Sequence, residues 1–131
     1  MHIGATWGRW DLHIHTPASY EWRGVRLRDA STPEAIHKLL TEVVDGINTS
    51  SCVAVGIMDY WTFDGVIALR RFLAMEGAPR CNATLFPGID LRMVPPGDFR
   101  LNVHVLHNPT LSDEKLQAFK AQLKLANLAK P

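Results

Sequence analysis

Two histidines separated by a single residue offer the clearest chemistry in this sequence. His13 and His15 lie in Asp11-Leu12-His13-Ile14-His15, whose alternation is typical of a β-strand. Side chains two apart on a strand share a face, so both imidazoles, about 6–7 Å apart along the strand, can reach one ion or two adjacent ions. Asp11 shares this face and can orient one of the rings. The Thr16-Pro17 break puts the pair at the carboxyl end of the strand, where α/β folds place active sites. A His-x-His pair on its own is also compatible with ordinary surface or core histidines.

Polar residues follow two other predicted strands. Asp59 and Tyr60 come directly after the apolar run 52–57, which is typical of a strand buried on both faces. Asp90 follows Pro87-Gly88, a dipeptide that predicts a turn. Because the carboxyl ends of parallel strands meet at one edge of a sheet, we expect these side chains on the same rim as the histidine pair.

The remaining histidines are weaker candidates. His104 lies within the apolar segment 101–106, where it either ligates metal or is a satisfied core histidine. His107 begins the loop that follows, and we expect it at most to line the site. His2 and His37 fit a chain tail and a helix surface, so neither is assigned a role.

The sequence also predicts the elements that must position these residues. Thr32-Pro33-Glu34 combines a hydroxyl cap, a proline and an acid, so a helix begins there, and Gly46 predicts its end. Ser112 caps a closing helix, and Pro95-Pro96-Gly97-Asp98 joins two strands as a hairpin. The predicted elements are strands over 7–14, 52–57, 89–94 and 101–106 and helices over 33–46, 66–75 and 112–128, the last with Leu116, Phe119, Leu123 and Ala126 as its buried stripe. This order predicts an α/β fold with mostly parallel strands and one hairpin.

The composition is that of one soluble domain. Of the 131 residues, 47% are hydrophobic and 21% charged, and the formal net charge of +1 gives no general basic field for nucleic acid. No apolar run approaches the roughly 18 residues of a membrane span, and we find no leader, so neither a membrane partner nor a signal peptide is expected. Cys52 and Cys81 are isolated in the sequence, which favours free thiols in a reducing compartment and predicts a cytoplasmic protein.

Four segments, in this order, resemble the PHP superfamily, named for polymerase and histidinol phosphatase. They are Asp11-Leu12-His13-Ile14-His15-Thr16, Gly56-Ile57-Met58-Asp59-Tyr60, Pro87-Gly88-Ile89-Asp90 and Val103-His104-Val105-Leu106. The likeness extends from about Trp10 to Leu106 and is closest to the PHP modules that precede an AAA-like or SMC-like ATPase.

The resemblance implies a distorted (β/α)7 barrel that holds two or three divalent ions, of zinc, manganese or iron, and hydrolyses phosphate esters. It implies that His13 and His15 are the first metal ligands, that Asp90 stands where the family usually has a bridging glutamate, and that His104 is a later ligand. Asp59 would orient a ligand or take part in proton transfer. The substrate would be a phosphorylated small molecule or a nucleic acid, and an ATPase domain would follow residue 131. The candidates for contact with the substrate phosphate are the loop arginines Arg23, Arg26 and Arg28.

The chain also departs from the PHP pattern. Tyr20 and Tyr60 stand where many members have metal-binding residues, and a phenol with a pKa near 10 is a poor ligand at neutral pH. Asp90 is one methylene shorter than glutamate. No counterpart of the family's last histidine or of its Asp-x-His motif follows His107, and a barrel of this type takes roughly 200 residues or more. We therefore expect residues 1–131 to form a single incomplete PHP-like domain, the N-terminal part of a larger protein and inactive when isolated.

Two rival predictions remain. The first is an amidohydrolase-type barrel, which also has a His-x-His after its first strand but needs a bridging lysine or glutamate that is missing here. The second is a degenerate PHP module that binds or regulates beside an ATPase without turnover.

Overall fold

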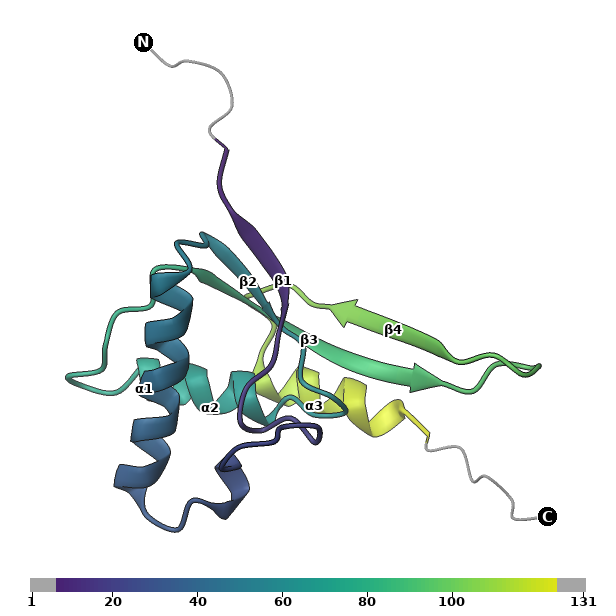
Figure 1. Cartoon of the computed structure of the whole chain (residues 1–131), viewed down its shortest axis with the longest axis horizontal. Coiled ribbons are helices and arrows are strands. Elements are labelled where there is room, and N and C mark those ends of the chain that lie inside the picture. Colours follow the sequence, from purple (N-terminus) through teal and green to yellow (C-terminus); the bar gives the residue numbers. More distant parts are fainter. Residues whose placement is uncertain (1–6, 125–131) are drawn as a thin grey trace.

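Four strands form one mixed sheet in the order β1-β2-β3-β4 (Figure 1). The computed structural model describes residues 7–124. The strands are β1 (Trp10–Ile14), β2 (Ala54–Ile57), β3 (Thr84–Met93) and β4 (Leu101–Leu106). β1 and β3 both run parallel to β2, whereas β4 returns antiparallel to β3 as a hairpin. The predicted α/β class, with parallel strands and one hairpin, is confirmed.

The helices cover one side of this sheet (Figure 1). They are α1 (Pro33–Thr49), α2 (Asp64–Leu73) and α3 (Asp113–Gln122), with a short 3-10 turn, η1 (Leu27–Asp29), before α1. The core lies between the helices and the sheet, and its fully buried side chains include Val44, Val55, Val66, Ile89 and Leu116. Among residues 7–124, no helix is long and apolar enough to cross a membrane.

The predicted capped starts of α1 and α3 are confirmed, whereas α2 spans Asp64–Leu73 rather than 66–75, and the predicted ends of α1 and α3 are wrong. The Thr32 hydroxyl accepts a hydrogen bond from Ala35 N at 3.2 Å, and Ser112 caps α3 in the same way. α1 continues past Gly46 to Thr49 because Ile47 extends its buried stripe. α3 ends at Gln122 rather than near 128. Phe119 and Leu123 pack against the core as expected. Ala126, predicted to join them, and His2, predicted to lie in a chain tail, are outside the described residues.

The turn predicted at Pro87-Gly88 is wrong, because both residues lie inside β3. At this point the strand changes partner: Pro87 is the last residue paired with β2, and Gly88 is the first paired with β4. Proline has no N–H for the ladder, but its carbonyl still accepts from His107 N at 2.7 Å. A Cβ on Gly88 would lie 2.7 Å from Met58 Cε, so the Met58 side chain would have to move to make room for one. The strand can therefore continue where the sequence pattern predicts a break.

Candidate metal centre

The four residues expected to bind metal come together on one face of the sheet. His13 Nε2 lies 3.0 Å from His15 Nε2 and 3.9 Å from Asp90 Oδ2. His104 Nε2 lies 3.5 Å from Asp90 Oδ1, and its ring meets the His13 ring edge-on at a centroid distance of 4.3 Å. One ligand atom from each of His13, His15 and Asp90 lies within 4.8 Å of the other two.

The sheet explains why residues from three strands converge. Asp90 and His104 lie directly opposite each other in the antiparallel register of β3 and β4. β1 is separated from β3 by β2, but β2 ends at Ile57 and the chain beyond it bonds to both neighbours. Met58 N donates to Ile14 O at 2.7 Å, and Asp90 N donates to Asp59 O at 3.0 Å. The end of β1 is thereby drawn close to the middle of β3.

A bulge in β1 changes what Asp11 does. Asp11 pairs with Val55 and Ile14 pairs with Ile57, so three steps along β1 are matched by two along β2. The Asp11 carboxylate accepts from the His13 backbone N–H at 3.1 Å. Asp11 does line the hollow beside His13 and His104, as predicted, but it orients the backbone of the bulge rather than an imidazole ring.

The donor set fits a divalent metal ion. Two nitrogens each bound at 2.0–2.1 Å to one tetrahedral zinc lie about 3.3 Å apart, close to the 3.0 Å between the His13 and His15 Nε2 atoms. Asp90 Oδ1 is buried without a hydrogen-bond partner, which leaves a carboxylate oxygen for a cation. Burial and the neighbouring His13 lower the pKa of His15, and a neutral imidazole is the form that ligates. Histidine with carboxylate suits zinc, manganese or iron.

Ser19 supports His15 and was missed in the sequence. Its hydroxyl oxygen lies 3.1 Å from His15 Nδ1 and accepts from Tyr60 N at 3.0 Å, and the residue is only 1% exposed. A hydroxyl four residues after a ligand histidine is the signal that the Thr16-Pro17-Ala18-Ser19 turn contained. Metal-binding histidines usually have such a partner on their second nitrogen.

The Asp59 carboxyl group is buried against Thr16, and its predicted catalytic role stays a prediction. The side chain is 1% exposed, and its two oxygens accept from Thr16 N and from Thr16 Oγ1, each at 2.6 Å. Burial raises the pKa of Asp59 to about 7, against the opposing effect of the two Thr16 hydrogen bonds. The carboxyl group ties the loop after β1, which carries His15 and Ser19, to the loop after β2.

The two tyrosines predicted to line the site have different neighbours. Tyr60 lies beside Asp90 through an isolated bridge, with its ring under the Arg92 guanidinium at 4.8 Å. Tyr20 is half exposed, and its ring contacts Arg28 instead.

His107 lies on the opposite face of the sheet, so the prediction that it lines the site is wrong. Its ring packs against Phe119 at 4.7 Å and Phe63 at 5.5 Å, and burial lowers its pKa. The reason is strand parity: His107 follows His104 by three positions, an odd number, so their side chains point to opposite faces.

The loop arginines are not gathered at the centre. Arg26 Nε donates to Trp22 O at 3.2 Å, and Arg28 lies over Tyr20. Arg23 alone lines a hollow that His15 also lines. A phosphate contact by Arg26 or Arg28 is therefore not supported by where they lie.

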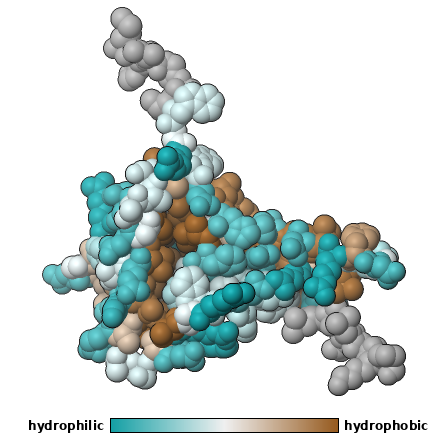
Figure 2. Space-filling model, in the orientation of Figure 1, coloured by the Kyte–Doolittle hydropathy of each residue, from teal (hydrophilic) through white to brown (hydrophobic). Residues whose placement is uncertain are grey.

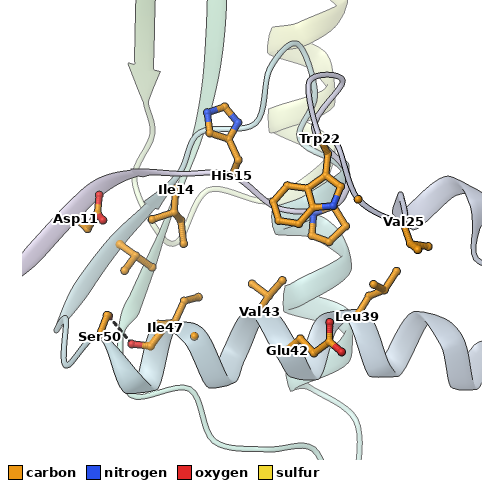
Figure 3. Close-up of a pocket in the computed structure, with 14 residues that line it drawn as sticks. Asp11, Ile14, His15, Trp22, Val25, Leu39, Glu42, Val43, Ile47 and Ser50 are labelled. Carbon is orange, nitrogen blue, oxygen red and sulfur yellow. Dashed lines mark hydrogen bonds between the residues drawn. The ribbon is translucent and has the colours of Figure 1, made fainter.

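A larger apolar cavity of about 530 Å³ lies on the helix side of β1, and its lining includes His15. Ile47, Val43 and Leu39 of α1 line one side of it, opposite Ile14, Trp22 and Val25, and the His15 ring turns away from it (Figure 3). Figure 2 shows the hydrophobic surface gathered beside α1.

None of the protein families, curated proteins or solved structures compared with the chain matches it. What the site can do therefore has to come from its own donor atoms and their geometry.

Proposed function

We propose that this chain carries the first part of a metal-dependent phosphoesterase centre of the PHP type. The single observation that carries the proposal is the convergence of His13, His15, Asp90 and His104 from three strands that are far apart in sequence. These are the four positions that the resemblance assigns to metal. We further propose a (β/α)7 barrel, of which the four strands make up about half, in a cytoplasmic protein with an ATPase neighbour.

The roles of the chain's own residues follow from their contacts. His13, His15 and Asp90 would hold one ion, and His104 with the free Asp90 Oδ1 would hold a second. When bound, such ions would supply an activated water and neutralise charge on phosphoryl oxygens. Ser19 keeps His15 in place, and the Asp59–Thr16 tether fixes the loop that carries both. The substrate class is a phosphate mono- or diester, from a small molecule or a nucleic acid.

Tyr20 supports a second candidate function. Its half-exposed ring contacts Arg28 and supplies no ligand, as in a degenerate module that binds a phosphorylated partner without turnover. Hydrolysis separates the two functions, because only the enzyme turns over.

The test is hydrolysis of p-nitrophenyl phosphate and bis-p-nitrophenyl phosphate by the full reading frame that contains this chain, with Mn²⁺ or Zn²⁺ added. We expect release of nitrophenol that EDTA abolishes and that His13→Ala reduces by at least a hundredfold. Bound metal without any hydrolysis would support the binding module, and a folded protein without metal would contradict the enzyme and leave the binding module.

A further inference from the structure

Arg92 is placed beside the candidate metal centre by the register of the hairpin. It follows Asp90 by two residues on β3, so both side chains share one face at a spacing of about 6–7 Å. Across the ladder, Asp90 lies opposite His104 and Arg92 lies opposite Asn102. The Arg92 side chain therefore leaves β3 two residues beyond Asp90, on the face that carries Asp90 and His104.

Two groups hold the Arg92 guanidinium. It lies over the Tyr60 ring at 4.8 Å and forms an ion pair with the Glu21 carboxylate. The Arg92 side chain is 46% exposed and that of Glu21 is 44% exposed. An ion pair this open to water contributes only about 0–1 kcal/mol, so a competing anion can replace the carboxylate.

Glu21 belongs to the same neighbourhood. It stands in the loop after β1, six residues beyond His15, and lines a hollow of about 270 Å³ with His15, Ser19 and Trp22. Glu21 thus joins Arg92 to a hollow whose lining includes His15, a candidate metal ligand.

We propose that Arg92 is the phosphoryl-binding residue of this site and that Glu21 is a placeholder which the phosphoryl oxygens displace. A phosphate group presents two oxygens to a guanidinium in the same planar arrangement as a carboxylate does. Stacking on Tyr60 keeps the guanidinium plane oriented while the anion is exchanged. The inference rests on the proposed function, because the metal centre would hold the remaining phosphoryl oxygens. The shared chemistry is a phosphoryl anion, whether a monoester or a diester supplies it.

The experiment titrates inorganic phosphate and dimethyl phosphate into the metal-loaded chain by calorimetry. We expect Arg92→Gln to weaken phosphate binding by about 10- to 100-fold, as for a charge-assisted hydrogen-bonded pair. Glu21→Gln should tighten binding by about two- to fivefold because the competing carboxylate is gone. Arg28→Gln is the matched control, since Arg28 is an exposed arginine on Tyr20, and should leave affinity unchanged. Phosphate binding tighter than dimethyl phosphate binding would assign the site to monoesters, and the reverse order to diesters.

Measuring the metal content of each variant distinguishes a failure of the proposed function from a failure of the role proposed for Arg92. A wild-type chain without metal overturns the proposed function. A metal-loaded wild type that binds neither anion, or an Arg92→Gln variant with wild-type phosphate affinity, overturns the role of Arg92. A Glu21→Gln variant that loses metal overturns the placeholder and makes Glu21 a ligand.

Discussion

At the scale of single residues, the Ser19 hydroxyl occupies Nδ1 of His15 and leaves Nε2 to face His13. When His15 Nδ1–H donates to Ser19 Oγ, the Nε2 lone pair points toward His13 Nε2. Tyr60 N donates to the same oxygen and fixes it in place. Ser19 is therefore a positioning residue for the metal centre.

The first prediction concerns this hydroxyl. Ser19→Ala should weaken binding of Zn²⁺ or Mn²⁺ by about 10- to 100-fold, the usual effect of losing an outer hydrogen bond to a ligand histidine. Competition with a chelating dye measures the affinity. Ser31→Ala, at an exposed loop serine, is the control and should bind as the wild type does. Equal affinities in the two variants would show that Ser19 does not orient His15.

Some residues of the candidate site could be identified from the sequence and others could not. His13 and His15 could be chosen from the sequence because the period of a strand places them together. Asp90 and His104 were indicated by the resemblance to the PHP superfamily, since both lie inside strands rather than at strand ends. Ser19, Glu21 and Arg92 could not be identified, because their contacts depend on the path of a loop without a repeating pattern. The burial of the Asp59 carboxyl group against Thr16 could not be predicted either, because the contact joins two loops that are 43 residues apart in sequence.

At the scale of elements, replacing two helical glycines with alanine should change the free energy of unfolding in opposite directions. A Cβ on Gly65, in the first turn of α2, would lie 2.1 Å from Asp59 Oδ2 and 2.2 Å from Thr16 Oγ1. Gly46, inside α1, has nothing within 4 Å of the same position. Gly65→Ala should thus lower the free energy of unfolding by about 1–3 kcal/mol by breaking the tether. Gly46→Ala should raise it by about 0.5–1 kcal/mol, because alanine favours helix.

Urea unfolding of the two variants measures both changes. Equal stabilities for Gly65→Ala and the wild type would show that the Asp59–Thr16 tether does not constrain the start of α2.

His107 makes stability depend on pH. Burial lowers its pKa, and Nε2 is buried without a partner, so the folded chain favours the neutral ring. The unfolded chain takes up the proton near the ordinary value of about 6.5, and stability should fall as the pH drops through that value. His107→Phe should retain the packing against Phe63 and Phe119 and show a smaller loss between pH 7.5 and 5.5. Urea midpoints at both pH values measure this, and an unchanged loss would contradict it.

Helices and turns could be predicted where the signal lies in neighbouring residues, such as a capping hydroxyl or a buried stripe. Thr32, Ser112 and the hairpin after Met93 follow directly from residue type. The continuity of β3 through Pro87 could not be predicted, because it depends on β2 and β4 meeting the strand on either side of that residue.

At the scale of the whole molecule, the candidate centre joins strands from across the sheet. β1 contributes His13, β3 contributes Asp90 and β4 contributes His104. The α/β class with its parallel strands was predictable from the order of elements, whereas closure into a barrel stays a prediction. A metal ion bound at the centre would couple the first strand to the hairpin, so its binding reports on the fold and on the site together.

The most direct test is the metal content of the purified chain after loading with Zn²⁺ or Mn²⁺ and removal of excess ion. The account predicts two bound ions in the wild type and loss of both in the double variant His13→Ala/His15→Ala. His37→Ala, which removes a histidine of α1 far from the centre in sequence and beside Phe72, should keep them. A folded wild type without metal, or a double variant that keeps its ions, would contradict it.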